Sequence, residues 1–153
     1  MIVDTKYIRN EILKIGWPKV TASRIIPWTP KYCLISEVMI GKLLEKSFVP
    51  LMTYIPDFAE CDFFALQFQA ETRHKRYLAH MRAREQGEVS EELKYPVPMA
   101  IAWGDMFRGK SENHVANLFV CEEGIRLADA MPMEKRYWKA SSDNDNMFTI
   151  DFR

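Results

Sequence analysis

Residues 114–129 read HVANLFVCEEGIRLAD. Apolar residues fill both halves, and the glycine in the central CEEG segment is typical of a tight turn, so the stretch predicts a β-hairpin. Pairing of Val120 with Ile125 across the turn places His114 and Asp129 on one face, diagonal to each other. Diagonal neighbours lie about 7–8 Å apart at Cα, which is close enough for a carboxylate to reach an imidazole. This register therefore predicts that the two side chains meet.

A long helix is predicted upstream, from about Phe58 to about Gly87. Asp57 and Glu60, three residues apart, fit a capping-box pattern. Cys61 then lies in the first turn, at the start of an apolar stripe with helical spacing. The stripe continues through Phe64, Ala65 and Phe68. We expect this helix to pack on one face of the hairpin, formed by Leu118, Val120, Ile125 and Leu127.

A thiol, an imidazole and a carboxylate in this arrangement predict a nucleophilic cysteine. A free thiol has a pKa near 8.5, and a helix N-terminus and a nearby imidazolium lower it. His114 would take the thiol proton and return it to the leaving group. Asp129 would hold the imidazole in one tautomer. The predicted chemistry is acyl transfer at an amide through a thioester, with Cys61, His114 and Asp129 as catalytic residues; the acceptor, water or an amine, is left open.

These residues resemble the transglutaminase-like cysteine peptidase superfamily, which includes bacterial transglutaminase-like cysteine proteinases and is similar to papain in its core. The family has a cysteine that opens a helix, and here Cys61 is followed by Phe64 and Ala65. The interval from His114 to Asp129, 129 − 114 = 15 residues, also matches the family pattern. The resemblance covers residues 55–132. It implies an α+β fold, with N-terminal helices and a central Cys-bearing helix on an antiparallel sheet, and a protein or peptide amide substrate.

Two positions depart from that pattern, and the loss of the acid at one of them, together with the lack of a clear oxyanion donor, favours an alternative function. Phe63 stands where the family commonly has an acid, and Ala116 stands where it often has an aromatic residue. No upstream residue is a clear oxyanion donor, and Tyr54 is the candidate. The alternative is a catalytically inactive binding or structural protein with the same fold, in which Cys61 is a core residue. A cell-wall amidase of the NlpC/P60 kind is a third alternative. Such amidases tend to carry an export signal or a wall-binding module, and neither is visible in this sequence.

The rest of the chain predicts the surroundings of this core. The 153 residues are typical of one domain. We expect a helical extension over residues 1–50, with helices at 4–15 and 34–46, and further strands at 97–103 and 147–152. Trp103 and Asn113 are expected at the rim of any substrate cleft beside His114. The basic second half of the long helix, residues 72–85, is expected to be a solvated face.

Composition excludes several classes of function. Lys and Arg number 21, as do Asp and Glu, so no nucleic-acid partner is expected. No apolar run reaches the about 18–20 residues that span a bilayer, and the first ten residues do not predict a signal peptide. Three cysteines favour a reducing, cytoplasmic location over a disulfide framework. Neither a metal nor a cofactor is expected, and the oligomeric state is left open.

Overall fold

The computed structural model of the chain describes residues 1–56, 60–88, 90–132 and 136–153. Its helices are α1 (Thr5–Leu13), α2 (Glu37–Glu45) and α3 (Cys61–Glu85), together with the short 3-10 helices η1 (Ala22–Arg24), η2 (Val49–Leu51) and η3 (Glu92–Lys94). Its strands are β1 (Ile2–Asp4), β2 (Ile25–Ile26), β3 (Lys31–Cys33), β4 (Met99–Phe107), β5 (Lys110–Cys121), β6 (Gly124–Asp129), β7 (Arg136–Lys139) and β8 (Asn146–Asp151). The predicted long helix and the predicted hairpin, β5–β6, are both present.

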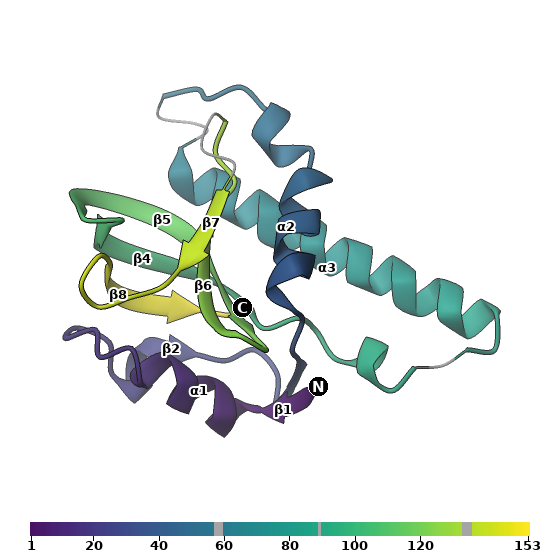
Figure 1. The fold of residues 1–153 in the computed structure, drawn as a ribbon. Coiled ribbons are helices and arrows are strands. Elements are labelled where there is room, and N and C mark those ends of the chain that lie inside the picture. Colours follow the sequence, from purple (N-terminus) through teal and green to yellow (C-terminus); the bar gives the residue numbers. More distant parts are fainter. Residues whose placement is uncertain (57–59, 89, 133–135) are drawn as a thin grey trace.

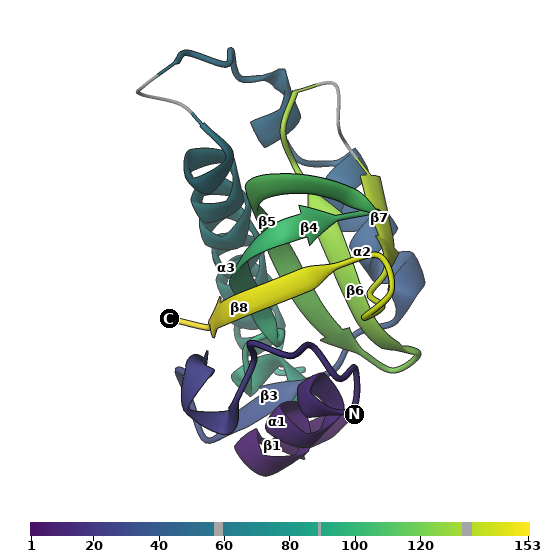
Figure 2. The same cartoon turned by 90° about the vertical axis from the view of Figure 1, so that its left-hand side faces the viewer.

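A six-stranded sheet in the order β2-β8-β4-β5-β6-β7 forms the centre of the fold (Figure 1). Its neighbours pair antiparallel except β2 and β8, which run parallel, with Ile25 opposite Ile150. The strands β1 and β3 pair separately, close to the N-terminus (Figure 2). In the hairpin Val120 faces Ile125, so the predicted register is confirmed.

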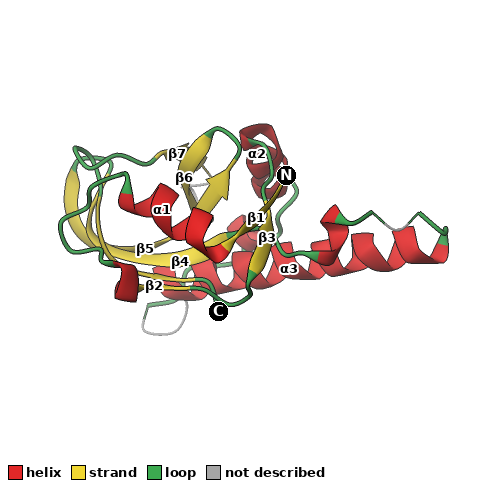
Figure 3. Cartoon of the chain, turned by 90° about the horizontal axis from the view of Figure 1, so that it is seen from below, coloured by secondary structure: helices red, strands yellow, loops and turns green. Residues whose placement is uncertain are grey.

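Helices cover both faces of this sheet (Figure 3). On one face Leu118 and Val120 pack with Ile8 and Ile12 of α1. On the other face Phe119 packs with residues of α2 and α3, including Phe64 and Phe68. The prediction that Leu118, Val120, Ile125 and Leu127 pack on the Cys-bearing helix is therefore wrong. Because β5 is apolar on both faces, its alternation could not indicate which face that helix covers.

The ends of the helices follow local rules in part. Asp4 caps α1, and its carboxylate accepts a hydrogen bond from the Tyr7 backbone N–H at 2.8 Å. The helix α3 begins at Cys61, and Glu60 is its N-cap residue. The predicted cap Asp57 and predicted start Phe58 lie outside the described residues. None of the helices within the described ranges is both long and apolar enough to cross a membrane.

The predicted fold class, an α+β domain of N-terminal helices and a Cys-bearing helix on an antiparallel, papain- or transglutaminase-like sheet, is wrong. The fold is mainly a mixed six-stranded sheet with one long helix. Residues 1–50 supply the strands β1, β2 and β3 as well as helices. These strands contain only two or three residues each, which is too few for a period of two to show in the sequence.

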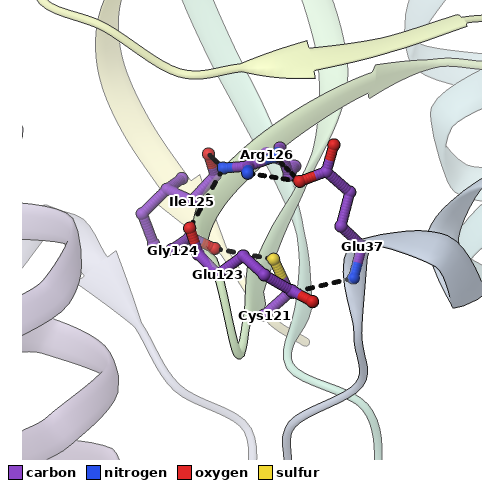
Figure 4. Close-up of polar contacts among 6 residues, drawn as sticks. All are labelled: Glu37, Cys121, Glu123, Gly124, Ile125 and Arg126. Carbon is purple, nitrogen blue, oxygen red and sulfur yellow. Dashed lines mark hydrogen bonds and ion pairs between the residues drawn. The ribbon is translucent and has the colours of Figure 1, made fainter.

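The turn of the hairpin holds α2 in place through polar contacts (Figure 4). The buried Arg126 side chain donates a hydrogen bond from Nε to the Glu37 carboxylate at 2.9 Å. The Glu37 backbone N–H in turn donates to the Glu123 carboxylate at 2.8 Å. Cys121 donates from Sγ to the Gly124 carbonyl at 2.9 Å, and burial raises its pKa. This thiol is therefore part of the turn and distinct from that of Cys61.

Candidate functional site

Cys61, His114 and Asp129 lie together although they come from three different elements. Cys61 is the first residue of α3, His114 lies in β5, and Asp129 is the last residue of β6. His114 Nε2 and Asp129 Oδ2 are 2.8 Å apart. The Cys61 side chain lies close enough to the imidazole to raise its pKa, and Nδ1 is the ring nitrogen that the Asp129 contact leaves free. The imidazole thus connects the thiol to the carboxylate.

Hydrogen bonds between α3 and the sheet place Cys61. Asn117 of β5 donates from Nδ2 to the Ala65 carbonyl, one turn after Cys61, at 2.9 Å. Farther along the helix, Gln69 donates from Nε2 to the Met99 carbonyl of β4 at 3.0 Å. Both side chains are buried, where a hydrogen bond to a backbone carbonyl is costly to break. The start of α3 is therefore fixed to the middle of the sheet.

The hairpin and a neighbouring phenylalanine place the imidazole and the carboxylate. Asp129 accepts a second hydrogen bond through Oδ1, from the Met131 backbone N–H at 3.0 Å. The ring of Phe107 meets the His114 ring edge to face, with centroids 5.1 Å apart and an angle of 89°. Both rings of this pair are largely buried. His114 is thus held on two sides, by the Asp129 carboxylate and by an aromatic wall.

The surroundings of His114 change its protonation. Burial lowers the pKa of the imidazole, but the hydrogen bond to Asp129 and the influence of Asp129 and Cys61 outweigh burial and raise the pKa from 6.5 to about 9. His114 is therefore protonated at neutral pH. The first turn of a 25-residue helix adds a partial positive charge next to the thiol. A cation and a helix N-terminus beside a partly exposed cysteine are the usual setting of a reactive thiol.

Gly104 of β4 lies opposite His114 in the sheet. Its lack of a side chain leaves room for the Phe107 ring and for the backbone of β8. A Cβ atom at Gly104 would lie 2.5 Å from the Asn146 carbonyl and 2.9 Å from the Phe107 ring. We expect Gly104→Ala to lower the free energy of unfolding by about 1–3 kcal/mol, measured by urea titration, because the β8 backbone has to move. In Gly41→Ala the three atoms nearest to the added Cβ all belong to the Tyr137 side chain, the nearest at 3.3 Å. That control should stay within about 1 kcal/mol of wild type, and an equal loss in both variants would contradict the assigned crowding.

The other predicted site residues occupy less central positions. Trp103 of β4 packs beside Cys61 on the cluster of Ala65, Ile101 and Val115. Asn113 is exposed and directly precedes His114. Tyr54, the oxyanion candidate, is 45% exposed, and within the described ranges no hydrogen bond joins it to the three central residues. The same ranges contain no group of three or more His, Cys, Asp or Glu residues that could hold a metal ion.

Sequence reasoning missed Asn117, Phe107 and Gly104. A glycine within the bulky strand MAIAWGDMF is a signal of a bulge or a close approach, and the register of β4 does shift after Gly104. Phe107 and Asn117 carried no such signal. An apolar ring and a strand amide acquire their roles only when β4, β5 and α3 are in contact.

Comparison with known proteins identifies solved structures that have a similar fold. No family model and no curated protein matches the chain. Solved structures do match, among them PSL1a in complex with E64, with 13% identity, and the Polyporus squamosus lectin bound to the human-type influenza-binding epitope Neu5Aca2-6Galb1-4GlcNAc, with 14% identity. Each has a TM-score of 0.66 and matches 97% of this chain. The chain spans 50% of the first and 49% of the second, and at this identity the likeness concerns the fold alone.

These findings correct the predicted family. The matching chains are those of a lectin, so the resemblance to the transglutaminase-like cysteine peptidase superfamily is wrong. The predictions that depended on it, a hydrolase or acyltransferase of that type and a protein or peptide amide substrate, are overturned with it. The physical reason is that a cysteine, a histidine and an aspartate at hairpin spacing form a local pattern, which more than one fold can carry.

Proposed function

We propose that this chain is a binding protein, and that it engages its ligand at the Cys61 thiol with His114 and Asp129 as partners of that thiol. The observation that carries the proposal is the imidazole of His114, which contacts the Asp129 carboxylate at 2.8 Å and lies close enough to Cys61 for that side chain to raise its pKa. The lectin chains with the same fold support binding as the activity. The complex of PSL1a with E64 makes E64 the first compound to try at Cys61.

In this proposal Cys61 captures a ligand that carries an electrophilic carbon. The sulfur forms a bond to that carbon, and the bond from the carbon to its leaving oxygen breaks. His114 donates the Nδ1 proton to that oxygen, and Asp129 stabilises the imidazolium beforehand and orients the ring. The product is a covalent adduct on Cys61, so one ligand is held for each thiol.

The rate of alkylation by iodoacetamide tests this proposal. We expect Cys61 to react readily at neutral pH, and His114→Ala to lower its rate constant by about 10-fold to 100-fold, because the cation that favours the thiolate is lost. Peptide mass spectrometry gives the rate at each cysteine separately. Cys33 and Cys121 are buried in the folded protein, and serve as internal controls that should remain unlabelled.

A matched variant and a protection experiment complete the test. His80→Ala removes a histidine from the other half of α3, and it should leave the rate at Cys61 unchanged. Preincubation with E64 should block alkylation of Cys61. If His114→Ala reacts as fast as wild type while both proteins unfold at the same urea concentration, Cys61 is a core residue and the proposal is wrong.

A second candidate is binding of a saccharide. It is favoured by the lectin whose structure holds Neu5Aca2-6Galb1-4GlcNAc. Because this chain spans about half of that lectin, the sugar has to be tested on this chain directly. Isothermal titration of the trisaccharide into the Cys61→Ser variant measures non-covalent binding without the thiol. Heat of binding there would support the second candidate, and its absence would leave the thiol site as the proposed site of engagement.

We further propose a cytoplasmic location. All three cysteines are free thiols. Free thiols, and a reactive one above all, persist in a reducing compartment.

A further inference from the structure

A cavity of about 290 Å³ lies beside the second half of α3. Its walls come from three parts of the chain that are distant in sequence: the connection between β2 and β3, the helix α3, and the segment that runs from η3 to β4. Most of its wall is apolar or aromatic, formed by Trp28, Tyr77, Leu93, Tyr95, Val97 and Met99. The volume is at the lower end of the range for small-molecule pockets.

Two guanidinium groups of α3 line this apolar wall. The Arg73 Cζ atom lies 4.4 Å from the centre of the Trp28 ring, and Arg73 also donates to the Phe152 carbonyl. Arg76 donates from Nε to the Tyr95 carbonyl at 3.2 Å. The Arg73 side chain is partly buried, and this desolvation lowers the pKa of its guanidinium. The two residues were expected on a solvated face, and the structure corrects that prediction.

Among the described residues, no direct ion pair neutralises the charge of these two guanidinium groups. Over the described ranges neither Arg73 nor Arg76 forms an ion pair with a carboxylate. Asp151 acts on Arg73 only through its charge, and it is itself paired with Arg153 at 2.9 Å. Partly buried cations bind anions more strongly than exposed ones, because water competes less.

A buried hydroxyl in the same wall also lacks a hydrogen-bond partner in the described part of the chain. Thr72 is 3% exposed and lines the cavity. Its Oγ1 atom has no hydrogen-bond partner among the described residues. An unpaired buried hydroxyl is costly, so this atom would be stabilised by a ligand that accepts or donates a hydrogen bond there.

We propose that this cavity binds a small carboxylate with an apolar body. The carboxylate is held by the guanidinium groups of Arg73 and Arg76, and the Thr72 hydroxyl supplies a further hydrogen bond. The apolar body packs against Tyr95, Val97 and Met99. The site is separate from the thiol site, since Thr72 lies about three turns along α3 from Cys61, or roughly 17 Å.

Two probes that differ only in charge test the proposal. They are 3-phenylpropionate and its neutral amide, 3-phenylpropionamide, each titrated into the full chain. The readout is the NMR signal of the Trp28 indole N–H, identified by its absence in Trp28→Phe. We expect the carboxylate to bind with a Kd of about 0.1–1 mM and the amide at least about tenfold more weakly.

Three variants then locate the binding. Arg73→Gln should weaken carboxylate binding about tenfold or more, while Arg84→Gln, an equal charge change on an exposed part of α3, should not. Thr72→Val removes the hydroxyl at nearly constant shape, and it should weaken binding about fivefold while the protein stays as stable as wild type or becomes more so. Equal binding of the two probes, or no movement of the Trp28 signal, would overturn the proposal. The alkylation rate of Cys61 in the same samples reports on the thiol site independently.

Discussion

Between about pH 6 and about pH 9.5, the free energy of unfolding falls by about 2–3 kcal/mol more in the wild-type protein than in a His114→Gln variant. The reason is the raised pKa of His114, which is about 9 in the folded protein against an ordinary value of 6.5. The folded state therefore holds the proton more tightly than the unfolded state does. The resulting stabilisation is fully present below pH 6.5 and is lost as the pH rises through 9.

Urea titrations of both proteins at the two pH values measure this difference. Glutamine at position 114 retains a donor for the Asp129 carboxylate but does not titrate, so it removes the effect of the proton while keeping a hydrogen bond. Asp129→Asn should also reduce the pH dependence, because the negative charge that raises the pKa of His114 is gone. Parallel curves for wild type and His114→Gln would show that the imidazole is not held as described.

Replacing Asp145 by alanine is expected to lower the free energy of unfolding by about 3–5 kcal/mol. The carboxylate is fully buried and accepts hydrogen bonds from the Arg108 backbone N–H at 3.0 Å, from Trp138 Nε1 at 3.1 Å and from the Ser141 backbone N–H at 3.0 Å. Arg108 has a positive φ of 53°, so the Asp145 bond also stabilises a strained turn between β4 and β5. Alanine leaves all three donors without their acceptor.

Asp143→Ala is the matched control for this change. Asp143 is exposed and lies in the same loop, two residues before Asp145. Its replacement should change the free energy of unfolding by less than about 0.5 kcal/mol. Thermal unfolding followed by circular dichroism compares the two variants directly. A similar small effect for both would mean that the three donors find other partners, such as water, when the carboxylate is absent.

The hairpin and the helix could be read from residues close together in sequence. Apolar residues on both sides of a glycine turn predicted the pairing of Val120 with Ile125, and this register is sufficient to bring His114 to Asp129. The helical spacing of Cys61, Phe64 and Phe68 predicted α3. Both inferences succeed because their physical causes are local. Pairing across a short turn and the periodicity of a helix each depend on residues that are a few positions apart.

The family and the layers of the fold could not be read in this way. Leu118 and Phe119 are both fully buried, and nothing in an apolar strand distinguishes the face under α1 from the face under α3. The strands β1, β2 and β3 owe their pairing to distant partners, such as Ile150 for Ile25. The pattern of Cys61, His114 and Asp129 is compatible with several folds, so it indicated the wrong family.

Local residue order thus specifies the thiol, the imidazole, the carboxylate and the hairpin that joins the last two. Contacts between distant segments decide how deeply these groups are buried and which charged groups lie beside them. The raised pKa of His114 requires Cys61 and Asp129 to approach the same ring from α3 and β6. The cavity of Arg73, Thr72 and Trp28 requires three segments to close around it. Burial and electrostatic coupling depend on distances in space, and only the packed chain defines those distances.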